Sequence, residues 1–179
     1  MPTRRTLQFI SGYMVGGLLV LVLIPWGLWQ ASAAFDHLTG IQLIPSAALR
    51  VTMAVALVLL GLPLGLWSIV VQNTVGKGGP VEIAGIEVTP KTQNLVVTGP
   101  YKYTRNPMLL GACVFYYGVA VYLNSVTAVA IVTLFMALML AEVRLIEEPR
   151  LLKDFGSEYE EYRRRVSMFV PWRQGRRRP

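Results

Sequence analysis

The sequence predicts an all-α membrane protein: a polytopic bundle of four transmembrane helices with a cytoplasmic loop and a C-terminal amphipathic helical segment. Its mean hydropathy is +0.49. Of its 179 residues, 54% are hydrophobic and only 15% are charged, which is typical of membrane proteins. Three long runs contain no charged residue, namely Thr6–Phe35, Val51–Gly76 and Asn106–Ala141. We expect residues 1–179 to form one domain, since a chain of this length has room for one.

The first two uncharged runs are each long enough for one membrane helix, which needs about 20 residues. We expect spans over about residues 8–35 and 47–71. Each span contains a proline, Pro25 in the first and Pro63 in the second. A proline inside a helix removes a backbone hydrogen bond, so both spans are expected to be kinked.

The third uncharged run has 36 residues and is too long for one span. As a single helix it would measure about 54 Å, against about 30 Å for the hydrocarbon core of a bilayer. The segment Tyr122–Ser125 supplies an interfacial aromatic residue and then helix-breaking polar residues, which indicates a turn. The run therefore predicts two further spans, over about residues 107–122 and 125–143.

The basic residues predict the orientation of the chain. Two precede the first span, four lie in Gln72–Arg105, ten lie in Arg144–Arg178, and Arg50 stands apart. Four spans place the three basic segments on one side, which the positive-inside rule makes cytoplasmic, together with both termini. The basic cytoplasmic segment 145–179 is expected to attract anionic lipid headgroups, at about 1 kcal/mol per basic residue. No basic motif interleaved with aromatic residues is present, so nucleic acid is excluded as a partner.

Both long cytoplasmic segments show internal patterns. In the loop Gln72–Thr98, apolar and polar residues alternate over Val81–Val88, which predicts a short β-hairpin. After the last span, apolar residues recur at spacings of three and four, which is typical of an amphipathic helix. Gly156 interrupts that pattern, so we expect two short helices there.

No metal or disulfide chemistry is predicted. Cys113 is the only cysteine, which excludes an internal disulfide and a cysteine-based metal site. It lies in an apolar run, as a small buried residue would. The single histidine, His37, has no second histidine near it that would complete a metal site.

Two polar segments carry the candidate chemistry. The first reads QNLVVTGPYKYTRNPMLLG over Gln93–Gly111, and the second reads EEPRLLKDFGSEYEEYRRRV over Glu147–Val166. They resemble the motifs LVxxGxYxxxRHPxYxG and EExxLxxxFGxxYxxYxxxVP of the isoprenylcysteine carboxyl methyltransferase and phospholipid methyltransferase superfamily. The positions that match are Leu95, Val96, Gly99, Tyr101, Arg105, Pro107, Gly111, Glu147, Glu148, Leu151, Phe155, Gly156, Tyr159, Tyr162 and Val166.

The resemblance implies an integral-membrane methyltransferase that uses S-adenosylmethionine, releases S-adenosylhomocysteine and takes a lipid or lipid-like acceptor from the bilayer. Such a donor needs an acceptor for its ammonium group, hydrogen-bond donors for its carboxylate and an apolar slot for its adenine. It needs no metal, since the sulfonium is already activated. By the resemblance, Glu147 contacts this cofactor and accepts its ammonium group. The other cofactor-binding positions that the resemblance implies are Gln93, Asn94, Leu95, Val96, Tyr101, Asn106, Pro107, Met108 and Leu109.

Two further charged residues are candidates for catalysis. Glu148 follows Glu147 and points about 100° away from it on a helix. It either orients an arginine, serves as a base for an amine acceptor, or belongs to a solvated pair at a helix start.

Arg105 lies just before Asn106 and Pro107, where Pro107 suits the first position of a helix. Arg105 is either part of the site or an interfacial residue whose head snorkels. The backbone N–H groups of Met108, Leu109 and Leu110 are expected to be open to a carboxylate at that helix start.

Arg144 is the third candidate for catalysis. In the isoprenylcysteine enzymes that the chain resembles, an arginine near this place holds the substrate carboxylate. Here Val143 takes the equivalent position, and Arg144 follows it. Arg144 is therefore either a carboxylate ligand or a positive-inside anchor. The site also lacks an imidazole and a phenol of that branch, because Asn106 and Leu109 replace histidine and tyrosine.

Several functions remain open on the sequence. The preferred acceptor is an isoprenylcysteine-type carboxylate, with N-methylation of a phospholipid amine, for which Glu148 or Glu142 would be the base, or S-methylation of a small thiol as alternatives. A non-catalytic membrane protein with a degenerate site is a further alternative. Tyr116, Tyr117 and Tyr122 either line a lateral entry for a lipid or are packing and interfacial residues.

Overall fold

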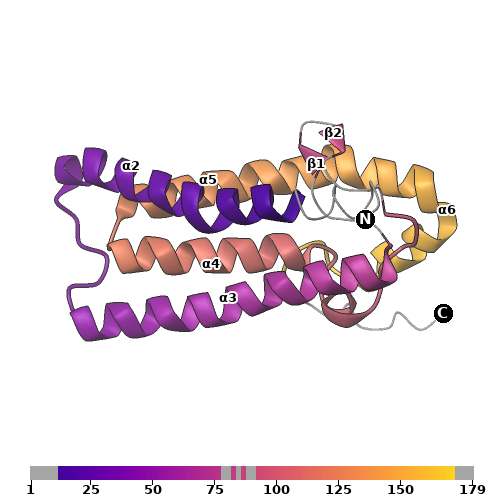
Figure 1. Cartoon of the computed structure of the whole chain (residues 1–179), viewed down its shortest axis with the longest axis horizontal. Coiled ribbons are helices and arrows are strands. Elements are labelled where there is room, and N and C mark those ends of the chain that lie inside the picture. Colours follow the sequence, from indigo (N-terminus) through magenta and orange to yellow (C-terminus); the bar gives the residue numbers. More distant parts are fainter. Residues whose placement is uncertain (1–11, 78–81, 84–85, 88–91, 172–179) are drawn as a thin grey trace, which may run out of the picture.

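The computed structural model describes residues 12–77, 82–83, 86–87 and 92–171. Four long helices lie side by side, and each runs antiparallel to the one before it (Figure 1). They are the first helix, which contains the π-helical turn η1 (Leu19–Leu23) and α2 (Ile24–Thr39), then α3 (Ala47–Val75), α4 (Pro107–Leu123) and α5 (Val126–Glu142). A second π-helical turn, η3 (Val143–Glu147), joins α5 to α6 (Glu148–Arg165). The predicted all-α bundle is confirmed.

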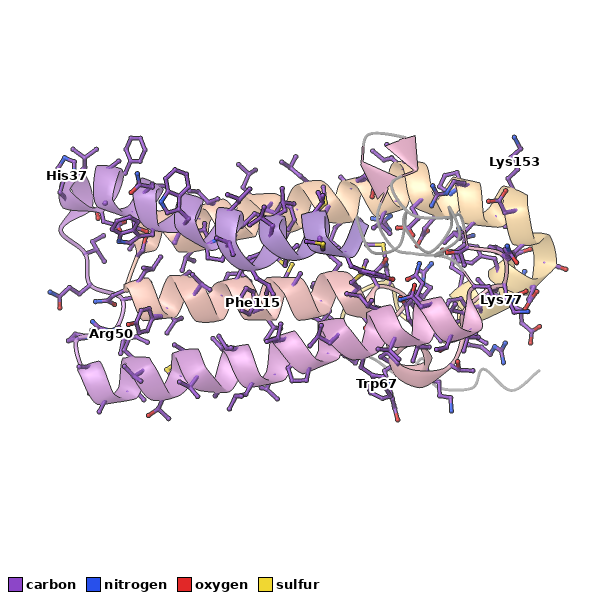
Figure 2. All side chains as sticks on the ribbon, viewed as in Figure 1. His37, Arg50, Trp67, Lys77, Phe115 and Lys153 are labelled. Carbon is purple, nitrogen blue, oxygen red and sulfur yellow. The ribbon has the colours of Figure 1, made fainter. Side chains whose placement is uncertain are left out.

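Among the described residues, three helical segments are long and apolar enough to cross a membrane: Gly12–Thr39, Ala47–Val75 and Val126–Arg165. Helix α4 is apolar but has 17 residues, about 26 Å of helix, which is at the lower limit for a span. The start of the described chain, the end of α3 and the start of α6 lie at one end of the bundle, which we call the loop end (Figure 1). Lys77 and Lys153 lie at this end, whereas His37 and Arg50 lie at the opposite, turn end (Figure 2).

The predicted turn between the last two helices of the bundle is confirmed. Asn124 adopts the left-handed conformation, with φ of 56°, and ends α4. The Ser125 hydroxyl accepts a hydrogen bond from the Ala128 N–H at 2.8 Å and so caps α5. The same hydroxyl accepts a hydrogen bond from Ser32 of α2 at 2.7 Å. The turn therefore ties α2 to the α4–α5 hairpin.

Glycines let α3 and α4 pack with their backbones in contact. A Cβ atom added at Gly61 would lie 2.6 Å from the Gly111 carbonyl oxygen, and one added at Gly111 would lie 2.6 Å from the Gly65 nitrogen. Small residues four positions apart on a membrane helix permit this close approach. The α3–α4 pair is thus held by van der Waals contact along its length.

Pro25 explains the π-helical turn of the first helix. The Ile24 N–H donates to the Leu19 carbonyl, five residues back, and Pro25 has no N–H to offer the next carbonyl, that of Val20. The buried Tyr116 hydroxyl of α4 donates to the Val20 oxygen at 3.1 Å instead. Tyr116 therefore packs inside the bundle and completes the hydrogen bonding of the first helix, so it is not part of a lipid entry.

The loop-end segments largely follow the predicted patterns. Strands β1 (Glu82–Ile83) and β2 (Ile86–Glu87) form the expected antiparallel hairpin. Gly156 has φ of 53° and ψ of −127°, which divides α6 into two helices as expected. The predicted start of the loop at Gln72 is wrong, because α3 continues through Gln72 to Val75.

We predict that Tyr116→Phe lowers the free energy of unfolding by about 1–2 kcal/mol, because the Val20 carbonyl then has no donor inside an apolar bundle. Reversible unfolding in mixed micelles measures this change. Tyr122→Phe is the matched control, since the Tyr122 side chain is 62% exposed. Equal stability of the two variants would contradict the structural role given to Tyr116.

Candidate functional site

The segment after the hairpin is fastened to the end of α3. The N–H groups of Gln93 and Asn94 both donate to the Gly76 carbonyl, at 2.8 and 3.2 Å. The Asn94 side chain donates to the Val75 carbonyl at 3.0 Å. Val96 is buried, and a Cβ at Gly76 would lie 2.9 Å from its Cγ2 atom. The chain therefore enters the site over the last turn of α3, with the Gln93 and Asn94 side chains exposed.

A short 3-10 helix, η2 (Gly99–Lys102), then presents Tyr101 to the interior. Tyr101 is 8% exposed, and its hydroxyl donates to Gln72 Oε1 of α3 at 2.6 Å. The Tyr162 hydroxyl of α6 donates to the Tyr101 carbonyl at 2.8 Å. Burial raises the pKa of Tyr101, and the negative charge of Glu147 raises it further. Tyr101 is therefore a neutral hydrogen-bonding group within electrostatic reach of Glu147.

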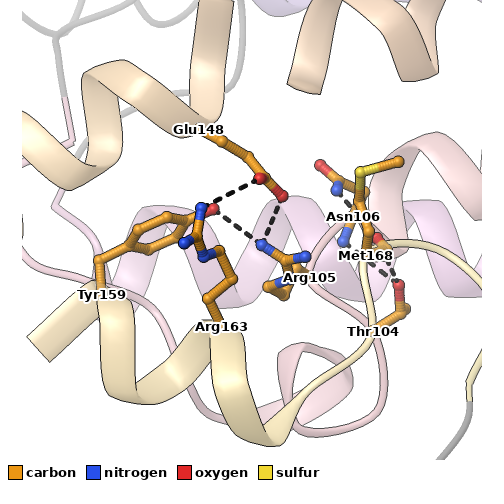
Figure 3. A network of polar contacts seen from close by, with 7 residues as sticks. All are labelled: Thr104, Arg105, Asn106, Glu148, Tyr159, Arg163 and Met168. Atoms are coloured by element: carbon orange, nitrogen blue, oxygen red, sulfur yellow. Dashed lines mark hydrogen bonds and ion pairs between the residues drawn. The ribbon is translucent and has the colours of Figure 1, made fainter. Parts of the chain in front are cut away.

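An ion pair between Arg105 and Glu148 forms the centre of the site (Figure 3). The two side chains are 11% and 10% exposed. Nη1 of Arg105 also donates to the Tyr159 hydroxyl at 3.1 Å. Nη1 of Arg163 lies 3.8 Å from the second carboxylate oxygen of Glu148. We call these four residues the Arg105 cluster.

Two atoms of the Arg105 cluster bear on what it can bind. The Arg105 Nε atom is buried and has no hydrogen-bond partner among the described residues. Burial raises the pKa of Tyr159, while the positive charge of Arg105 opposes that rise. The Tyr159 hydroxyl is thus neutral, and a buried N–H of Arg105 has no acceptor among the described residues.

The segment that follows α6 closes over the start of α4. The Arg105 N–H donates to the Ser167 carbonyl at 2.9 Å. The Thr104 hydroxyl and the Asn106 side-chain amide both donate to the Met168 carbonyl, at 3.2 and 2.9 Å (Figure 3). Two segments more than 60 residues apart in the sequence are joined in this way.

Pro107 begins α4, as predicted, and is buried. The Asn106 side chain does not cap the helix, because its amide group is turned to Met168. The Leu110 N–H donates to the Asn106 carbonyl at 3.0 Å, so the expectation that it is open to a ligand is wrong. The N–H groups of Met108 and Leu109 precede that first helical bond and have no side-chain cap.

Comparison with known proteins places this arrangement in a family. Residues 49–158, more than half of the chain, match the family model described as phospholipid methyltransferase. The chain belongs to the phospholipid methyltransferase family. The methyltransferase assignment drawn from the two polar segments is therefore confirmed at the level of the family, and with the apolar helices it makes the chain an integral membrane protein.

Two similar proteins match part of the chain. Methanethiol S-methyltransferase 1 of Bradyrhizobium diazoefficiens is 34% identical over 96 residues, which cover 51% of this chain and 30% of that protein. The nickel-cobalt-cadmium resistance protein NccN of Alcaligenes xylosoxydans xylosoxydans is 36% identical over 81 residues, which cover 45% of this chain and 38% of that protein. The matched part thus spans about a third of the length of these relatives. No solved structure is significantly similar to the chain.

The fold brings two of the three candidate catalytic residues of this family member together. Arg105 and Glu148 are 43 residues apart and form the ion pair, so Arg105 does not snorkel and Glu148 is not solvated. Glu147 is half-buried beside them. Arg144 is exposed and makes no ion pair with a described residue, whereas Val143 is 6% exposed. The structure therefore keeps Arg144 out of the Arg105 cluster.

Sequence reasoning did not assign four residues of this region to the site: Gln72, Tyr159, Tyr162 and Arg163. Tyr159 and Tyr162 match the second family motif and belong to the amphipathic pattern, but neither has a role in the site on the sequence alone. They are three positions apart on α6, and their rings meet edge to face at 6.2 Å between centroids. That spacing is the signal that both tyrosines face one partner. Gln72 and Arg163 carry no such signal, since their partners come from distant segments.

We predict that Glu148→Gln lowers the free energy of unfolding by about 3 kcal/mol, because it leaves the Arg105 charge buried without its counter-ion. Glu160→Gln on the same helix is the matched control. Glu160 pairs with Arg164 at 2.7 Å on the exposed surface, where solvent screens the interaction and little change is expected. Denaturant unfolding of both variants in micelles tests this, and a Glu148 variant as stable as the control would be inconsistent with a buried pair.

Proposed function

We propose that this membrane methyltransferase transfers a methyl group from S-adenosylmethionine to a small apolar thiol that reaches the site from the bilayer. The Arg105 cluster is the observation that supports this proposal most. It brings charged and neutral polar groups from both family motifs to one place beside an apolar bundle. A degenerate site in a non-catalytic protein would have no reason to retain both partners of a costly buried ion pair.

The residues at the site fit the two charged ends of this donor. The buried Arg105 Nε and the uncapped N–H groups of Met108 and Leu109 suit a carboxylate. The half-buried carboxylate of Glu147 suits an ammonium group, beside the neutral Tyr101. When bound, S-adenosylmethionine supplies a methyl group on a cationic sulfur. The protein then contributes orientation and exclusion of water.

The remaining cofactor-binding positions would surround the apolar part of the donor. Val96, Tyr101 and Pro107 are buried, and Leu95, Asn106, Met108 and Leu109 are half-buried. Gln93 and Asn94 are exposed and hold the loop through their backbone N–H groups. We therefore assign Gln93 and Asn94 to the rim of the donor site and the others to its lining.

The acceptor is argued from charge. A carboxylate acceptor needs a cation, but the inward position is taken by the buried Val143, and Arg144 is exposed. An amine acceptor needs a base, and Glu148 is already engaged by Arg105. A small apolar thiol carries no charge that the site would have to pair, which fits the apolar Val143 at the inward position. The name of the methanethiol S-methyltransferase relative agrees with a thiol.

The donor would enter from the cytoplasm, with the loop end on that side. In the sequence, four basic residues lie in Gln72–Arg105 and ten in Arg144–Arg178. Of the described ones, Lys77 and Lys153 lie at the loop end, whereas Arg50 lies at the turn end (Figure 2). A cysteine at the exposed Lys102 should react with impermeant reagents only from the cytoplasmic face. A cysteine at the exposed Gln42 should react only from the opposite face. The reverse pattern would overturn this orientation.

The function is tested by donor binding and product analysis on purified protein in lipid nanodiscs. Calorimetry should show binding of S-adenosylmethionine and S-adenosylhomocysteine. Glu147→Ala should weaken both about 10- to 100-fold, because the ammonium group loses a charge-assisted partner. Glu158→Ala, at an exposed position of α6, should bind as the parent does.

To identify the acceptor class, the rates of methylation of different acceptors are measured in the same nanodisc preparations with labelled S-adenosylmethionine. Apolar thiols should be methylated faster than an isoprenylcysteine carboxylate or phosphatidylethanolamine, and Arg144→Lys should leave that rate unchanged. A carboxylate as best acceptor, with turnover lost in Arg144→Lys, would restore the carboxylate hypothesis, since lysine cannot replace a two-point arginine contact. A lipid amine as best acceptor would replace the thiol. Folded protein that binds no donor would remove the methyltransferase proposal.

A further inference from the structure

The two π-helical turns among the described residues have the same construction. Each ends two residues before a proline: Leu19–Leu23 before Pro25, and Val143–Glu147 before Pro149. The Glu148 N–H donates to the Val143 carbonyl, five residues back, as the Ile24 N–H donates to Leu19. Pro149 has no N–H, so the next carbonyl, that of Arg144, loses its helical partner just as that of Val20 does.

The two released carbonyls differ in their hydrogen-bond donors. The Val20 oxygen accepts the Tyr116 hydroxyl at 3.1 Å. Within the part of the chain that the structure describes, no side chain donates to the Arg144 oxygen. A backbone carbonyl without a donor is costly away from water, and π-helical turns often mark functional positions. The fold completes the first turn, whereas no side chain of the described residues completes the second.

The open carbonyl lies on the turn that carries the site. A helical carbonyl points along the axis toward the residues four and five positions further on, which here are Glu148 and Pro149. Glu148 is buried against Arg105. Glu147, on the same turn, is within electrostatic reach of the buried Tyr101, whose pKa is raised by burial and further by the Glu147 charge. The Arg144 side chain is exposed and makes no ion pair with a described residue.

We propose that the Arg144 backbone carbonyl, released by Pro149, accepts a positively charged group of the methyl donor. This inference rests on the proposed function and extends it from Glu147 to the backbone. The group is either the ammonium or the sulfonium with its polarised methyl hydrogens, since both are cationic donors of hydrogen to oxygen. A carbonyl oxygen has two lone pairs and needs no counter-ion, so it strengthens cation binding without a further buried charge.

The experiment compares Pro149→Ala with Pro25→Ala in nanodiscs. Pro149→Ala supplies an N–H to the released carbonyl, which then no longer accepts a group of the donor. We therefore expect S-adenosylmethionine, either alone or together with S-adenosylhomocysteine, to bind at least about ten-fold more weakly. The melting temperature without ligand should stay equal or rise, because a helix gains a hydrogen bond. Pro25→Ala should leave donor binding within about two-fold, since Tyr116 already occupies the Val20 carbonyl.

The two ligands identify the cation. Weaker binding of both S-adenosylmethionine and S-adenosylhomocysteine assigns the ammonium group, which they share. Weaker binding of S-adenosylmethionine alone assigns the sulfonium. Either result supports the proposal, and unchanged binding of both in a folded Pro149→Ala protein overturns it.

A double variant separates the carbonyl from an indirect shift of Glu147. Glu147→Asp keeps the carboxylate but withdraws it, and Pro149→Ala should still weaken binding about ten-fold in that background. No further loss in the double variant would mean that Pro149 acts only by placing Glu147, which overturns the role of the carbonyl. If the parent protein binds neither ligand, the proposed function fails. If it binds both and Pro149→Ala does not matter, only this inference fails.

Discussion

The site depends on one ion pair, between Arg105 and Glu148. Both side chains are almost withdrawn from water, and either charge alone would be costly there. Because the two residues are 43 positions apart, the pair fixes the loop before α4 against the start of α6. Tyr159 and Arg163 then come to the same charges from the second half of α6, which Gly156 turns back toward the bundle. The Met168 carbonyl accepts hydrogen bonds from the Thr104 and Asn106 side chains, which holds the segment after α6 over the start of α4. These contacts bring residues of both family motifs together in one place.

Two prolines of this bundle change the backbone hydrogen bonding of the helical turn before them. Pro25 and Pro149 each lie two residues after the end of a π-helical turn, and having no N–H they leave one carbonyl without its helical donor. At Val20 the neighbouring α4 supplies a tyrosine hydroxyl, and the result is a fixed contact between two membrane helices. At Arg144 the same backbone geometry occurs at the loop end, beside the Arg105 cluster. One covalent property of proline thus gives a packing contact in the apolar interior and, in our proposal, a ligand contact at the membrane boundary.

Our proposal for the acceptor rests on which of two neighbouring residues, Val143 or Arg144, faces inward. The inward position at the end of α5 holds Val143, and Arg144 is turned outward. An apolar side chain at that place can neither pair with nor donate a hydrogen bond to a carboxylate, whereas it suits an apolar substrate that approaches through the bilayer. Membership of the phospholipid methyltransferase family does not decide between these acceptors, because fold and donor chemistry can be shared while the acceptor differs.

The sequence by itself determined the bundle, the turn at Asn124, the break at Gly156 and the family, because these follow from local properties: uncharged run length, backbone preferences and motif spacing. It also determined that Arg105, Glu147 and Glu148 belong to the candidate site.

Tertiary structure alone decided that Arg105 pairs with Glu148, that Tyr116 completes the first helix, and that Gln72 supports Tyr101. It also decided that Arg144 is outside while Val143 is inside. The physical reason is that each of these outcomes depends on how two distant segments pack, or on a π-helical turn that changes which residues face inward. Neither can be read from spacing along one helix.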